Sequence, residues 1–189
     1  MLKKFETFPR TAILKLMTLV TLIGFIALTI LFQFDEATLQ AGSGYGIMDF
    51  ELAFTQATAS TILTAWGASL QAIVLRGTYV DFGYIVFYGL LLFSVTPLIS
   101  RTLKGRWQNI GLIFAFVPLI AGAFDVIENI NLIIMLNNPL SFAATIPMIA
   151  SLCATIKFTF LLVSIGFVAI GGIVWIIRKL GWRKAAPPK

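Results

Sequence analysis

The chain has 189 residues, of which 59% are hydrophobic and only 12% are charged, and its mean hydropathy is +0.95. This composition is far from that of soluble domains and excludes a water-soluble globule. The chain has a net charge of +6, no histidine and one cysteine, Cys153, which excludes imidazole-based acid–base catalysis, imidazole-held haem or zinc, thiolate clusters and an internal disulfide.

Hydropathy predicts four transmembrane helices, because a helix needs about 20 mostly apolar residues to cross the hydrocarbon core. The predicted spans are residues 16–34, 80–100, 110–136 and 149–177. The first span is longer than the apolar part of a signal peptide and no small-residue cleavage site follows it, so we interpret it as a retained anchor. The sequence therefore predicts an all-α fold, a single integral membrane domain over residues 1–189 built as a four-helix bundle.

The connection between the first two spans is long, from about residue 35 to residue 79. It opens with a glycine-rich stretch, residues 41–46, which we expect to be flexible. From about residue 50 to residue 75, apolar side chains recur at helical spacing, and the other face is polar but nearly uncharged. We predict an amphipathic helix in this external loop, lying on the membrane surface or folded over the bundle as a lid. An ordinary loop helix that buries its apolar face is the alternative.

The basic residues predict the orientation of the bundle. Twelve of the 14 lysines and arginines lie before the first span, between the second and third, or after the fourth, whereas the opposite side has four carboxylates and only Arg76. The positive-inside rule therefore places both termini in the cytoplasm, in a multi-pass protein of the inner (plasma) membrane. Topology and membrane lipid headgroups account for the positive charge, and no aromatic and basic stripe indicates a nucleic acid partner.

Ionisable side chains within the spans mark the candidate site, because such groups are costly in a bilayer and are usually paired or functional. At about 1.5 Å per residue, the four that occur are expected in the outer third of the membrane, with the acid of the second span at its outer start. Helical spacing adds two phenols and one amide to the same faces. The candidate ligand-binding residues are Asp81, Tyr84 and Tyr88 of the second span, Asp125, Glu128 and Asn129 of the third, and Lys157 of the fourth.

A structural role is the alternative for these residues. Lys157 would then pair with Asp125 or Glu128, or reach outward to water, Asp81 would cap the second span, and the tyrosines would belong to an interfacial belt. Two acids one turn apart repel each other, and a shared proton or a bound cation would relieve that repulsion.

We therefore expect an acidic, tyrosine-lined cavity that opens to the outer leaflet and binds a small amphipathic or cationic ligand, or a proton. Pro118 is expected to kink the third span and widen this cavity.

Other classes of function also fit the sequence. A lipid-modifying enzyme would use the acids as general acid and base or as Mg²⁺ ligands, although Asp-x-x-Glu occurs only once. An accessory subunit would use the polar cluster to bind a membrane-protein partner. Gly166, Gly171 and Gly172 would permit close helix approach within the bundle or in a homodimer, and a channel would require several copies. No metal or cofactor is assigned.

Residues 122–129, Gly-Ala-Phe-Asp-Val-Ile-Glu-Asn, with Asp81-Phe82-Gly83-Tyr84 and Tyr88 upstream, resemble a set of small bacterial four-helix membrane proteins. This resemblance spans about residues 48–157 and implies no activity. In layout alone, the chain is similar to the emopamil-binding and sigma-2-like family, whose acidic residues face a lipid-accessible cavity for sterols or cationic amphiphiles. The histidine that its isomerases use is absent here, so the similarity is to its binding proteins.

Overall fold

Helices are the regular secondary structure of the described part of the chain. A computed structural model describes residues 5–184, with side chains described for residues 5–177, and no strand occurs within those ranges. The helices are α2 (Thr11–Ser43), α3 (Ile47–Glu51), α4 (Gln56–Ser100), α5 (Arg106–Phe114), α6 (Val117–Asn137) and α7 (Thr145–Lys184). Four helical stretches are long and apolar enough to cross a membrane: Thr11–Ser43, Gln56–Ser100, Arg106–Asn137 and Thr145–Ile177. The prediction of an all-helical protein with four candidate membrane spans is therefore confirmed.

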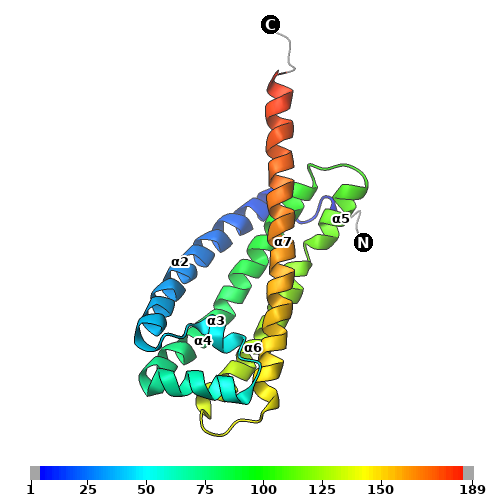
Figure 1. Ribbon diagram of the computed structural model, residues 1–189. Helices are drawn as coiled ribbons and strands as arrows, with labels where there is room; N and C mark the ends of the chain where they lie inside the picture. The colour runs from blue at the N-terminus through cyan, green and yellow to red at the C-terminus, as the bar shows by residue number, and fades with distance from the viewer. Residues whose placement is uncertain (1–4, 185–189) are drawn as a thin grey trace.

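Helix α4 lies at the centre of the bundle and packs against α2, α6 and α7. Helices α6 and α7 pack along each other, whereas α2 makes its main contacts with α4. Figure 1 shows α2 inclined to α7, so that the two helices diverge toward the end where the short helix α3 crosses between them. Helix α7 continues well past the other helices at the opposite end (Figure 1).

The first helix is longer than the predicted span. Helix α2 runs to Ser43 and ends where Gly44 adopts the left-handed conformation, with φ 76°, and donates its N–H to the Gln40 carbonyl at 2.9 Å. The glycine-rich stretch predicted to be flexible therefore begins inside this helix. A hydropathy profile places the end of a span at the first charged residues, here Asp35 and Glu36. The helix itself ends only where its last carbonyl groups are capped.

The second span and the loop helix are joined in α4 through a kink at Gly67. This residue has φ 58° and ψ 179°, a conformation that only glycine adopts without strain. The kink divides α4 into a short arm, residues 56–66, and a long arm, residues 68–100. The long arm begins about a dozen residues earlier than the predicted second span, so Asp81 lies inside a helix. The alternative that Asp81 caps the start of this helix is therefore wrong.

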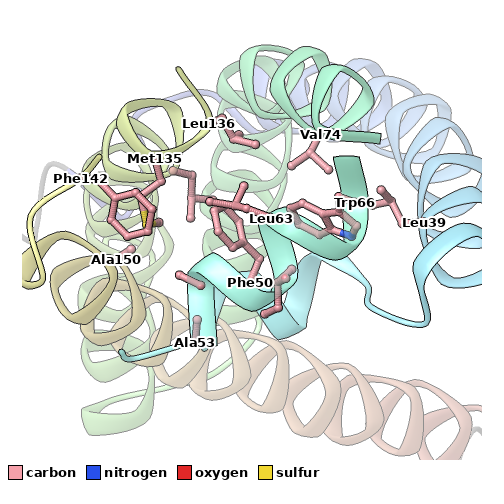
Figure 2. Close-up of a cluster of buried hydrophobic side chains, with 13 residues drawn as sticks. Leu39, Phe50, Ala53, Leu63, Trp66, Val74, Met135, Leu136, Phe142 and Ala150 are labelled. Carbon is pink, nitrogen blue, oxygen red and sulfur yellow. The ribbon is translucent and has the colours of Figure 1, made fainter. Parts of the chain in front are cut away.

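The short arm of α4 packs at one end of the bundle. Its side chains Ile62, Leu63 and Trp66 are buried and join a cluster that also includes Phe50 of α3 and Met135 of α6 (Figure 2). Phe50 and Trp66 meet edge to face with ring centroids 5.0 Å apart. These apolar side chains are therefore packed within the protein rather than turned toward lipid.

The third span contains a break, as the proline suggested. Helix α5 ends at Phe114 and α6 begins at Val117, with Pro118 in the first turn of α6. A proline is tolerated there because the first-turn N–H groups have no partner within the helix. The break therefore lies just before Pro118.

Replacing Gly67 with alanine should destabilise the protein by about 1–3 kcal/mol, because a Cβ strains the backbone of the kink. The matched control is Gly166→Ala in α7, where an added Cβ meets no atom within 4 Å and alanine favours the helix by roughly 0.5–1 kcal/mol. Unfolding midpoints in mixed micelles would measure both changes. Equal effects at the two glycines would contradict the requirement for positive φ at the kink.

Candidate functional site

One buried ammonium holds three carboxylates together. Lys157 of α7 is 5% exposed, and its Nζ lies 2.9 Å from Asp125 Oδ1, 2.8 Å from Glu128 Oε2 and 3.5 Å from Glu51 Oε2. The alternative that Lys157 pairs with Asp125 or Glu128 is thus confirmed for both acids, and the expectation that it reaches water is wrong. These ion pairs connect α3, α6 and α7, and the ammonium relieves the repulsion between the two acids of α6.

Glu51 is the member of this cluster that the sequence did not indicate, because it lies in the long connection between the first two predicted spans and not within a span. It ends α3, and its side chain is 12% exposed. Burial raises the pKa of the Glu51 carboxyl above its usual value, and the nearby Lys157 ammonium opposes that rise. A carboxylate directly after the buried Phe50 was the one local sign that this loop turns inward.

Asp125 is fully engaged by protein groups. It is 3% exposed, and while one carboxylate oxygen accepts from Lys157, the other accepts a hydrogen bond from the Tyr88 hydroxyl at 2.8 Å. Tyr88 is itself buried, so assigning it to an interfacial belt is wrong. Both oxygens of Asp125 therefore have a partner.

Glu128 is the most deeply buried acid of the cluster, with no exposed surface. Its Oε2 is close to the Lys157 ammonium, but neither oxygen has a partner in hydrogen-bond geometry among the described residues. The attraction is therefore that of two buried opposite charges rather than of a directed hydrogen bond. Glu128 does not line the cavity described below.

Asp81 differs from the acids of the Lys157 cluster because it has no ion-pair partner among residues 5–177. Its Oδ2 accepts a hydrogen bond from the Asn129 amide at 2.7 Å. Within the part of the chain whose side chains are described, no lysine or arginine lies within ion-pair distance of this carboxylate. Asp81 and Asn129 join α4 to α6 beside the Lys157 cluster, and both line the cavity.

Tyr84 faces α2 rather than the acids. Its hydroxyl lies 3.2 Å from the Thr29 hydroxyl, and its ring stacks on Phe25 with centroids 5.1 Å apart. It also meets the ring of Tyr88 edge to face at 5.7 Å. The two tyrosines therefore form a continuous aromatic wall.

These groups surround a cavity of about 540 Å³ with walls from α2, α3, α4, α6 and α7. This volume is within the usual range of small-molecule sites. Six of the seven residues singled out from the sequence line it, namely Asp81, Tyr84, Tyr88, Asp125, Asn129 and Lys157. The end beside α3 carries Asp35, Glu36 and Glu51, and the far end is lined by Phe25, Leu91, Leu92, Leu161 and Ile165. The cavity is thus acidic at one end and apolar at the other.

Helix α3 crosses the acidic end and is tied at both of its own ends. The Ile47 N–H donates to Glu36 of α2 at 2.9 Å, and Glu51 pairs with Lys157 of α7. Just beyond α3, the Phe54 N–H donates to the Ser151 hydroxyl of α7 at 2.9 Å. The short helix therefore bridges the two helices that stand on either side of the cavity.

Acids outnumber bases around this cavity. Five carboxylates line it and Glu128 adjoins it. Among residues 5–177, the ion pairs to these acids come from two bases, Lys157 and Arg76, the latter paired with Asp35. A low-dielectric site with unbalanced carboxylates attracts a cation or holds protons. No three histidine, cysteine, aspartate or glutamate side chains among the described residues are grouped to hold a metal ion.

A comparison with protein-family models gave no match, and neither did comparisons with curated proteins and with solved structures.

Proposed function

We propose that this protein binds a small cationic amphiphile in the cavity between α2, α4, α6 and α7. The observation that carries the proposal is that one cavity contains both Asp81, a carboxyl group with no ion-pair partner among the described residues, and an elongated apolar wall. A carboxylate in a low-dielectric site is costly to leave unpaired, and a cationic headgroup would supply the missing charge. Apolar walls of this kind would bury a hydrocarbon portion of the same ligand.

The division of roles follows from the contacts. Asp125 and Glu128 are held by Lys157, so the charge that we first expected them to supply falls to Asp81. Tyr84 and Tyr88 line the same cavity, and aromatic rings attract cations, including quaternary ammonium groups. Asn129 orients the Asp81 carboxylate through its amide.

The proposal includes the topology, with the protein in an inner (plasma) membrane, both termini in the cytoplasm and the cavity in the outer leaflet. Two basic segments meet at the end of the bundle opposite α3, where Arg101 donates to the Phe5 carbonyl at 3.0 Å. The positive-inside rule favours the cytoplasm for that end. Of the other basic residues that the positive-inside rule counts, Lys3, Lys4 and Lys189 lie outside the described residues, and the side chains of residues 178–184 are not described.

Replacing Asp81 with asparagine should weaken binding of dodecyltrimethylammonium at least about tenfold, the equivalent of 1.4 kcal/mol, because it removes the counter-charge and keeps the shape. The measurement is a titration of protein in nanodiscs of zwitterionic lipid. The matched control is Glu6→Gln, which removes the same charge from a residue that does not line the cavity. Unchanged affinity in Asp81→Asn, or an equal loss in the control, would contradict the proposal.

A further inference from the structure

We infer that the ligand is a single-chain amphiphile that reaches the cavity from the lipid bilayer, through the opening between α2 and α7, and binds with its head at Asp81 and its chain toward Ile165. This inference rests on the proposed function and adds to it the route and the orientation of the ligand. Three features of the cavity carry it: its tied end, its exposed side wall and its gradient of polarity.

The end of the cavity beside α3 is obstructed. Helix α3 is anchored to α2 through Glu36 and to α7 through Glu51, and the Trp66 indole N–H holds the preceding loop by donating to the Tyr45 carbonyl at 3.1 Å. A ligand that came in at this end would have to displace α3 and break the buried Glu51–Lys157 ion pair, which is costly to separate.

The side of the cavity between α2 and α7 lacks such ties. Helix α2 packs mainly on α4, and α7 packs on α6 and α4. The space between α2 and α7 is therefore occupied by the cavity and not by a helix–helix interface. Phe25 and Phe32 of α2 and Phe158 of α7 line it there. Ile165 lines the cavity and is 51% exposed on a helix that is long and apolar enough to span a membrane. This side wall of the cavity is therefore apolar and, at Ile165, half exposed, as a wall that lipid chains cover would be.

The change from acidic to apolar walls along the cavity determines the orientation of the bound ligand. Asp81 and Leu92, both on the long arm of α4, line the cavity about 16 Å apart at 1.5 Å per residue. The acids lie at the Asp81 end, and the far end is made only of apolar side chains, among them Leu161. An elongated ligand with one charged end and one chain matches this arrangement, because each part then has a chemically similar wall.

The competing route is an opening at α3, where Met48 lines the cavity and is 47% exposed. The two routes are distinguished by placing one cysteine at each opening in a Cys153→Ala background, Ile165→Cys or Met48→Cys, and attaching a bulky maleimide in nanodiscs. Stopped-flow fluorescence with a dansyl-labelled alkylammonium probe then gives the association and dissociation rate constants before and after labelling.

We expect the label at Ile165→Cys to lower both rate constants tenfold or more, and the label at Met48→Cys to change them less than twofold. The route would be overturned if the label at Met48→Cys lowered the rate constants, or if neither label did. It would also be overturned if the label at Ile165→Cys weakened the affinity without slowing dissociation. Binding that still depends on Asp81 in those cases would leave the proposed function intact, whereas absent binding in the unlabelled wild type would refute the proposed function itself.

A second measurement tests the orientation without altering the opening. An alkylammonium probe with a diazirine at the end of its chain should label wild-type peptides that contain Phe25 or residues 161–165 at least five times more than the α3 peptide. Preferential labelling of α3 by the chain end would overturn the orientation.

Discussion

Replacing Lys157 with methionine should destabilise the protein by about 3–5 kcal/mol, because it removes the one cation from three buried acids. The Nζ of Lys157 contacts Asp125, Glu128 and Glu51 at 2.8 to 3.5 Å, and methionine keeps most of the aliphatic volume. The acids that remain would have to take up protons or draw water into the bundle. The unfolding midpoint in mixed micelles is the measurement.

The control for this prediction is the other ion pair of the cavity. Arg76 pairs with Asp35, but the Arg76 side chain is 56% exposed, and exposed pairs contribute about 0–1 kcal/mol. Arg76→Met should therefore change stability far less than Lys157→Met. If the two variants lose equal stability, the Lys157 cluster does not hold α3, α6 and α7 together.

A neutral replacement of the cluster separates charge from packing. Adding Asp125→Asn and Glu128→Gln to Lys157→Met removes two of the stranded acids and should recover much of the lost stability, because buried charges replaced together by neutral groups cost little. Absence of any recovery would mean that the shape of the lysine, rather than its charge, stabilises the bundle.

The sequence predicted which side chains meet in one cavity better than it predicted the chain path around that cavity. Helical periodicity and the cost of intramembrane charge are local rules, and they were enough to bring Asp81, Asp125, Asn129 and Lys157 to one cavity. The rules have limited angular precision, since three residues along a helix turn about 300° and leave an offset of about 60°. Tyr84, which is three residues after Asp81, accordingly faces Thr29 of α2 instead of the acids.

Glu51 could not be placed from the sequence because long-range packing sets its position. Its helix is held by Phe50 against Trp66 and by a hydrogen bond between Phe54 and Ser151, which are far apart in the chain. Hydropathy treats such a segment only as a polar connection between spans. The helix ends were missed for a related reason, because the positive φ angles of Gly44 and Gly67 decide them, and a hydropathy profile does not measure these angles.

Replacing Trp66 with alanine should also cost about 3–5 kcal/mol, since it leaves a cavity in the cluster that fixes the α3 end of the bundle. Trp66 is 2% exposed, packs against Phe50 and donates to the Tyr45 carbonyl. Trp107, which is 68% exposed, supplies the control, and Trp107→Ala should cost less than about 1 kcal/mol.

The effect of Trp66→Ala should extend to the Lys157 cluster, because Trp66 packs against Phe50 and Glu51 is the next residue on α3. Amide hydrogen exchange over residues 45–55 should therefore become faster in Trp66→Ala and stay unchanged in Trp107→Ala. Trp66→Phe, which keeps an aromatic ring but loses the indole N–H, should have an intermediate effect. Unchanged exchange in Trp66→Ala would show that the polar contacts of this segment with Glu36, Lys157 and Ser151, rather than the apolar cluster, hold α3 across the cavity.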